Sequence, residues 1–258
     1  MSQNHLTLAF PLKTPSDTKV LTDHFSPMMP ALFEAEDAIG TVHYSRFTVL
    51  SDKTFLFVAD FDGEFGQLML NLAKLAGPLF EWAAEHLLHP LTVFTAYSGV
   101  TAREIKALAA DAAVESATQQ LPFLVILPTR SRLAFIELQL LLRTMHSKVQ
   151  RDLAAVGTPH FAQFVSLEDN QVGFFTVYDG SFDKYIADFT KNIGEVFDLI
   201  FKFTKDPPPS PCRRHLQEFI DFAASANRAP IGFYQAYPGL SVQDIHALVA
   251  DREAGDKR

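Results

Sequence analysis

The sequence has one cysteine, Cys212, among 258 residues, so an intramolecular disulfide is excluded and a reducing compartment is the simpler expectation. No stretch supplies about 18 uninterrupted apolar residues, and residues 1–5 lack the basic segment of a secretory signal. Positive charge is scarce, with 22 lysines and arginines against 30 acidic residues and a net charge of -8. Nucleic-acid binding needs a basic surface. We therefore predict a bacterial cytoplasmic protein with neither a membrane nor a nucleic-acid partner.

Common catalytic signatures are missing as well. The chain has no Gly-x-x-x-x-Gly-Lys-Ser/Thr phosphate loop, no Cys-x-x-Cys pair, no His-Glu-x-x-His and no Gly-x-Ser-x-Gly. Hydrophobic residues make up 48% of the chain and charged residues 20%, a composition that can bury a sizeable core. The sequence therefore indicates a globular protein without naming its reaction.

What the sequence does contain is an internal duplication. Many residues recur 117 positions later, and a period of this length indicates duplicated domains, because solenoid repeats span only about 20 to 50 residues. We predict two domains, residues 1–119 and 120–258. The recurring features are His43 and His160, Phe47 and Phe164, Leu50 and Leu167, Asp52 and Asp169, Phe57 and Phe174, Gly77 and Gly194, Phe80 and Phe197, and Asp62-Gly63-x-Phe65 and Asp179-Gly180-x-Phe182.

Each half has the same predicted order of elements, βαββαβ, which is the ferredoxin-like order. The last strand of each half carries a similar sequence, but here the offset is 140, so the second half holds 23 extra residues. This insertion, near 205–228, begins with a proline-rich spacer and continues as a predicted helix. The expected elements are 6–12, 17–38, 41–50, 54–61, 64–88 and 94–99 in the first half, and 123–127, 131–155, 160–167, 171–178, 181–203 and 235–239 in the second.

The two predicted hairpins indicate how the halves pack. With two-residue turns, both faces of the first hairpin would be apolar, whereas a sheet with one wet face alternates. Since helices cover only one face of a ferredoxin-like unit, we predict an α+β fold in which the sister sheets pack as a pseudo-symmetric α/β barrel. The predicted faces are Phe47, Val49, Leu56 and Val58 on one side, and Tyr44, Leu50, Phe55, Phe57 and Phe61 on the other.

Tandem βαββαβ units with apolar inner sheets resemble the dimeric α/β-barrel superfamily, whose two-domain members include the dye-decolorising peroxidases, with chlorite dismutases as relatives. The resemblance covers nearly the whole chain and rests on topology, the duplication and the Asp-Gly-x-Phe turns. Those peroxidases carry a Gly-x-x-Asp-Gly motif, whose aspartate acts beside haem, and a histidine that binds the iron. Asp179 and Asp62 match the motif's Asp-Gly, but Thr176 and Ala59 stand where it has its first glycine.

The resemblance implies haem as a candidate cofactor, bound between sheet and helix near the insertion. His160, or His215 from the insertion, would be the axial ligand, and Asp179 and Arg46 would be the polar helpers. Each has a plainer alternative. Asp-Gly commonly closes a strand-to-helix turn, and His215 suits a solvated helix start. Arg46 would need a partner among its aromatic neighbours, either a ligand carboxylate or water.

The same hairpin register places His43 opposite Asp62, and His160 opposite Asp179. A carboxylate beside an imidazole fixes the ring's tautomer, which suits a general base, a metal ligand or a structural clamp. Catalytic sites seldom occur in duplicate within one chain, so the symmetric pairs favour the clamp.

Two functions follow from these observations. The first is a peroxidase-like barrel that binds haem or another small apolar ligand in a cavity lined by some of the 24 phenylalanines. The second is a non-catalytic duplicated scaffold that acts through protein contacts, a function that the missing glycine favours. A filled core with an exposed apolar patch would favour the scaffold. The sequence leaves a homo-oligomer open.

Overall fold

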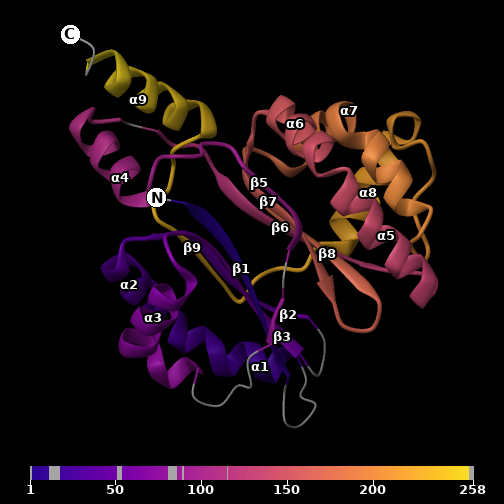
Figure 1. The fold of residues 1–258 in the computed structure, drawn as a ribbon, viewed down its shortest axis with the longest axis horizontal. Coiled ribbons are helices and arrows are strands. Elements are labelled where there is room, and N and C mark those ends of the chain that lie inside the picture. The colour runs from indigo at the N-terminus through magenta and orange to yellow at the C-terminus, as the bar shows by residue number, and fades with distance from the viewer. Residues whose placement is uncertain are drawn as a thin grey trace.

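The fold comes from a computed structural model, which describes residues 2–11, 18–50, 54–80, 86–88, 90–114 and 116–255. Within these ranges the chain is a mixed α+β protein of two tandem ferredoxin-like units (Figure 1). The duplicated architecture predicted from the repeat is confirmed. No helix in these ranges has the length and hydropathy needed to cross a membrane.

The two halves follow the same βαββαβ order, to which the first adds the short strand β4 and the second adds η2 and α8. The first contains β1 (Gln3–Pro11), α1 (Thr18–Phe25), the 3-10 helix η1 (Ser26–Met28), α2 (Met29–Ile39), β2 (Val42–Val49), β3 (Thr54–Asp62), α3 (Phe65–Phe80), β4 (His86–Leu87), β5 (Pro90–Thr95) and α4 (Ala102–Asp111). The second contains β6 (Gln120–Pro128), α5 (Arg132–Thr144), α6 (His146–Val156), β7 (Pro159–Leu167), β8 (Gln171–Asp179), α7 (Phe182–Phe201), the 3-10 helix η2 (Cys212–Arg214), α8 (Leu216–Ala226), β9 (Gly232–Gln235) and α9 (Val242–Gly255).

Several predicted boundaries need correction. The interruption of helix 17–38 expected near Pro27 and Pro30 is confirmed, because α1, η1 and α2 follow one another there, with each proline second in η1 or α2, where its missing N–H is tolerated. The predicted helix 64–88 is wrong at its end, where β4 occupies 86–87. The last strands lie earlier than predicted, at 90–95 and 232–235. The predicted helix of the insertion is present as α8.

The two sheets have exchanged their last strands. Their strand orders are β4-β1-β3-β2-β9 and β5-β7-β8-β6. The final strand of the second half, β9, pairs with β2 of the first half, and β5 of the first half pairs with β7 of the second. Each sheet is therefore completed by a strand from the other half, which ties the halves together through backbone hydrogen bonds.

The segment that precedes each exchanged strand forms a hydrogen bond with the sheet of its own half. The Leu88 N–H donates to the Thr7 carbonyl of β1, beside the pairing of β4 with β1. The Arg228 N–H donates to the Leu124 carbonyl of β6 before β9 joins β2. The two segments that lead from one half to the other thus form hydrogen bonds with both sheets. The two sheets nevertheless share no strand. The predicted barrel is accordingly a pair of facing sheets, not one closed sheet.

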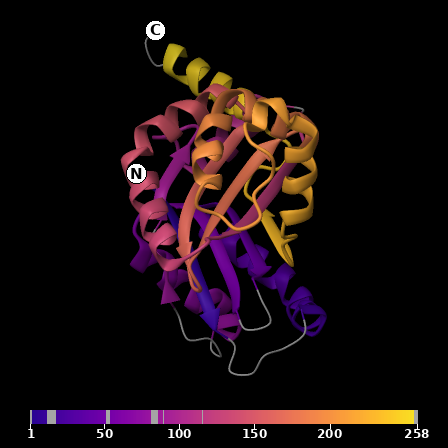
Figure 2. The ribbon, with the colours of Figure 1, turned by 90° about the vertical axis from the view of Figure 1, so that its right-hand side faces the viewer.

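The sheets face one another, and helices cover their outer faces (Figures 1 and 2). Phenylalanine dominates the cores between sheet and helices, with Phe55 and Phe57 in the first half and Phe164 and Phe174 in the second. Apolar residues on both faces of each sheet are thereby accounted for, as predicted. The apolar part of the layer between the two sheets consists of Ala9, Leu56, Val58, Leu124, Val165, Leu167 and Phe175.

The hairpin register differs by one residue from the prediction. Leu167 pairs with Gln171, so the second turn holds three residues, 168–170, of which Asp169 and Asn170 adopt left-handed φ angles of 55° and 58°. In the first hairpin Phe47 pairs with Phe57, and residues 51–53 of its turn lie outside the described residues. The predicted faces are therefore wrong. Phe47 shares the helix-covered face with Phe55 and Phe57, whereas Leu56 and Val58 face the other sheet.

One buried acid has no compensating partner. Glu36 of α2 is fully buried, and neither of its carboxyl oxygens has a hydrogen-bond partner among the described residues. Burial raises the pKa of Glu36 to about 8. The neighbouring Ser45 hydroxyl opposes this rise without offering a hydrogen bond of acceptable geometry. The folded chain therefore holds a proton on Glu36 near neutral pH.

Replacing Glu36 should change how stability depends on pH. In the unfolded chain Glu36 ionises near its ordinary pKa of 4.5, so its contribution to stability is complete below that pH and is lost as pH rises towards 8. We expect the free energy of unfolding to fall by about 4 kcal/mol across this window and the Glu36→Gln variant to lack this fall. Urea unfolding at pH 5 and pH 8 measures it. Glu34→Gln, on the exposed side of the same helix, is the control. A steep fall retained in Glu36→Gln would contradict the assignment.

Candidate functional site

A bulge in each hairpin brings a histidine opposite an aspartate. The register shifts at His43 in the first hairpin and at His160 in the second, and one extra strand residue offsets the one-residue difference in turn length. His43 Nε2 lies 3.0 Å from Asp62 Oδ1, and His160 Nε2 lies 2.7 Å from Asp179 Oδ1. Both rings are fully buried. The predicted pairs are present, although two compensating differences in register produce them.

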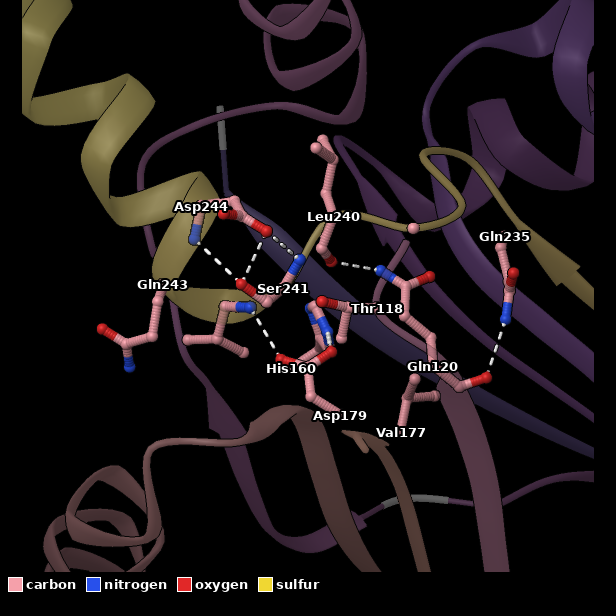
Figure 3. Close-up of polar contacts among 12 residues, drawn as sticks. Thr118, Gln120, His160, Val177, Asp179, Gln235, Leu240, Ser241, Gln243 and Asp244 are labelled. Carbon is pink, nitrogen blue, oxygen red and sulfur yellow. Dashed lines mark hydrogen bonds and ion pairs between the residues drawn. The ribbon is translucent and has the colours of Figure 1, made fainter. Parts of the chain in front are cut away.

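Each aspartate also holds the start of a helix. Asp62 Oδ2 accepts the Ala102 N–H of α4 at 2.7 Å, and Asp179 Oδ2 accepts the Val242 N–H of α9 at 2.8 Å. An aspartate that accepts a backbone N–H at a helix start stabilises that start. Figure 3 shows the second-half arrangement, with His160 and Asp179 beside the first turn of α9. The Asp-Gly pairs thus close strand-to-helix turns, which is the plainer alternative given from the sequence. Gly180 has a φ of 85° in its turn.

Two tyrosines join the two histidine–aspartate pairs. The Tyr237 hydroxyl lies 2.8 Å from His43 Nδ1, and the Tyr97 hydroxyl lies 2.9 Å from His160 Nδ1. The two hydroxyls are 2.7 Å apart. Each tyrosine follows an exchanged strand, so each contacts the histidine of the other half. We call the six side chains the His–Tyr network: Asp62, His43, Tyr237, Tyr97, His160 and Asp179.

The hydroxyl protons of the network are firmly held. Burial raises the pKa of both Tyr97 and Tyr237 well above the ordinary tyrosine value. The electrostatic effect of Tyr237 raises the pKa of Tyr97 further. The phenols are therefore neutral and act as hydrogen-bond donors and acceptors near neutral pH. A phenolate nucleophile or base is not favoured at this position.

The number of protons limits how the network can be bonded. Five contacts connect the six side chains, and the carboxylates at both ends only accept. A neutral histidine or tyrosine supplies one proton, so the four inner groups supply four protons for five contacts. The Tyr44 hydroxyl lies 3.1 Å from His160 Nδ1 and supplies a further donor. With Tyr44 donating to His160, Tyr97 to Tyr237 and Tyr237 to His43, every ring nitrogen and hydroxyl of the network has a hydrogen-bond partner.

Two glutamines, also 117 positions apart, hold the turns that carry the tyrosines. Gln3 Nε2 donates to the Val100 carbonyl at 2.8 Å, and Gln120 Nε2 donates to the Leu240 carbonyl at 2.6 Å (Figure 3). The sequence interpretation missed these glutamines and gave the tyrosines no role. Their recurrence, Gln3 with Gln120 and Tyr97 with Tyr237, was the available signal.

Arg46 is buried between the sheets and bonds to protein. Its Nη1 donates to the Thr176 carbonyl at 2.9 Å and to the Phe123 carbonyl at 3.3 Å, both in the opposite sheet. Burial lowers the pKa of Arg46 to about 10, against the opposing charge of Asp60, so the guanidinium remains charged near neutral pH. Its partners are thus backbone carbonyls, neither the ligand carboxylate nor the water expected from sequence. Asp60 itself is bonded to His5 at 2.6 Å.

His215 lies apart from the other predicted site residues. Its side chain is 39% exposed, and its Nδ1 lies 3.2 Å from Glu218 Oε1 at the start of α8. This is the solvated helix start given as the plainer alternative. The structure therefore brings His160 and Asp179 together and does not bring His215 or Arg46 into contact with them.

The described residues do not fit a haem. The space between β6, α7 and α8, where the ligand was expected, is a cavity of about 10 Å³ lined by side chains such as Phe123, Phe189 and Phe219, room for about one water. Sites for ligands of this kind hold about 300 to 1,000 Å³. Both ring nitrogens of His160 are already bonded, and His215 points to the surface.

Two larger hollows lie at the surface. One of about 640 Å³ is lined by residues such as Asp62, Glu64 and Gln67, and one of about 650 Å³ by residues such as Val49, Asn227 and Arg228. Within the described ranges, no three histidine, cysteine, aspartate or glutamate side chains are grouped so that they could hold a metal ion. The hollows therefore add no recognisable catalytic or metal-binding group.

No protein-family model matches the chain, and no curated protein matches it in sequence. A "Putative monooxygenase" from Fusobacterium nucleatum subsp. nucleatum ATCC 25586 is 10% identical, with 93% of this chain and 97% of that chain covered and a TM-score of 0.46. A second protein so described, from Lactobacillus acidophilus NCFM, is 8% identical, with 93% and 99% covered and a TM-score of 0.45. An anthrone oxidase-like protein is 11% identical, with 93% and 95% covered and a TM-score of 0.36. Similarities this low assign no activity, and the link to dye-decolorising peroxidases stays a prediction.

Proposed function

We propose that the chain is a duplicated α+β scaffold that acts through protein contacts and does not bind haem. The observation that carries the proposal is the engagement of His160, whose two ring nitrogens are bonded inside a buried network that joins the halves. The His–Tyr network accounts for the histidines and aspartates that the sequence offered for catalysis. Because each half needs one histidine–aspartate pair to complete the network, a structural role explains why the pair occurs twice.

The filled interior supports the same function. The layer between the sheets is filled by aliphatic side chains and Phe175 together with the buried polar side chains of Thr7, Arg46 and Gln163. The space beside the insertion is closed by Phe219 and Phe222. By contrast, the outer face of α5 exposes large aliphatic side chains. A filled core together with an exposed apolar face is typical of a protein that works through its surface.

The alternative is a peroxidase-like protein that binds haem or another apolar ligand. It requires α7 and α8 to separate from β6 by enough to open several hundred Å³, and it requires His160 to give up a hydrogen bond. A ligand at His215 would instead lie at the surface, beside Glu218. The scaffold requires neither change.

Haemin reconstitution tests the proposal. The protein is mixed with excess haemin and desalted, and its visible spectrum is compared with those of His160→Ala and His215→Ala. We expect no stoichiometric Soret band in the wild type, because neither histidine offers a free nitrogen to a cavity of haem size. A stoichiometric band in the wild type that one of the two substitutions abolishes would overturn the proposal and identify the axial ligand.

A further inference from the structure

We propose that the outer face of α5 binds an amphipathic helix of another protein, one with an aliphatic stripe and an acidic edge. This inference rests on the function proposed above and names the surface and the chemistry of the partner. It is carried by the exposure of one helical stripe, by the twin positions in the first half, and by the charges beside the stripe.

Three aliphatic side chains form a continuous exposed stripe on α5. Leu133, Ile136 and Leu140 are 65%, 53% and 64% exposed, and their spacing places them on one side of the helix. Leu138 and Leu142, on the opposite side, are completely buried against the second sheet. The helix is therefore anchored by one face and presents a second apolar face outward, and α5 itself lies on the outer side of the second sheet (Figure 1).

The first half has charged residues at two of the three equivalent positions. The repeat offset of 117 relates Ile136 to Lys19 and Leu140 to Asp23, and α2 and α6 follow at the same offset. Lys19 and Asp23 form an exposed ion pair at 2.8 Å, the ordinary arrangement on a solvated helix. The aliphatic stripe is thus a property of the second half alone, and the duplicated fold does not need it.

The charges beside the stripe indicate the partner's chemistry. At about 100° per residue, Arg132 and Arg143 lie along one edge of the stripe and Glu137 along the other. Both arginines are exposed, and no ion pair within the described ranges involves either one. In a chain of net charge -8, two unpaired cations beside an apolar stripe favour a partner with carboxylates along the facing edge.

A second copy of this chain fits the face less well. Pairing α5 with its own copy in antiparallel orientation about a twofold axis would bring the two arginine edges to the same side, with four guanidinium groups together. Pairing in parallel would align the two helix dipoles unfavourably. An acidic helix from another protein avoids both costs.

Synthetic helical peptides provide the probe. One peptide carries leucines at i, i+3 and i+7 with glutamates along one edge, and the other carries lysines in place of those glutamates. Fluorescence anisotropy with the full chain should show at least tenfold tighter binding of the glutamate peptide. Ile136→Ser should weaken that binding at least tenfold. Leu70→Ser, at a position on α3 with 59% exposure, should leave it unchanged.

The arms of the experiment separate the alternatives. Substituting both Arg132 and Arg143 by glutamine should remove the preference for the glutamate peptide while retaining part of the affinity. Equal binding of both peptides by the wild type, or equal effects of Ile136→Ser and Leu70→Ser, would overturn the assignment. If sedimentation shows a concentration-dependent dimer that Ile136→Ser dissociates, the occupant of the α5 face is a second copy of this chain and the proposed partner is wrong. The haemin experiment described above tests the scaffold function separately, because stoichiometric retention of haemin would overturn that function whatever the peptides show.

Discussion

The exchange of the last strands is the constraint on which the rest of the structure depends. Because β5 and β9 each complete the sheet of the other half, the turns that follow them meet near the pseudo-twofold axis. Tyr97 and Tyr237 lie in those turns, and each reaches the histidine of the other half. The same turns lead into α4 and α9, whose first N–H groups bind Asp62 and Asp179. Strand exchange, network and helix starts therefore form one cooperative unit.

Burying the side chains of the His–Tyr network is acceptable because each of them is hydrogen-bonded. A buried carboxylate without partners costs several kcal/mol, and each network aspartate has both a ring nitrogen and a backbone N–H. Arg46 follows the same rule by bonding to carbonyls of the opposite sheet. Glu36 departs from it and responds by keeping its proton. The second half differs mainly on its surface, where α5 has aliphatic residues at the positions of Lys19 and Asp23.

The sequence predicted the features that recur along the chain and missed those that depend on pairing between halves. The repeat and the alternation in the hairpins were enough to predict duplication, facing sheets and the pairs around His43 and His160. Because the turns hold three residues and not two, every cross-strand pair in the hairpins differs by one residue from the prediction. The bulges at His43 and His160 then restore the two histidine–aspartate pairs. Strand exchange leaves no mark on local periodicity, so the recurrence of Tyr97 and Tyr237 could mark these residues as important without predicting which histidine each contacts. The haem interpretation came from a resemblance in topology and duplication, together with an incomplete Asp-Gly match that a strand-to-helix turn also explains.

The central claim is that the His–Tyr network couples the two halves, and a double-mutant cycle on Tyr97 and Tyr237 tests it most directly. Each single Phe variant and the double variant would be unfolded in urea to obtain free energies of unfolding. Because the hydroxyls lie 2.7 Å apart and come from different halves, the account predicts an interaction energy of about 0.5 to 3 kcal/mol. Additive effects, with an interaction energy below about 0.3 kcal/mol, would contradict it.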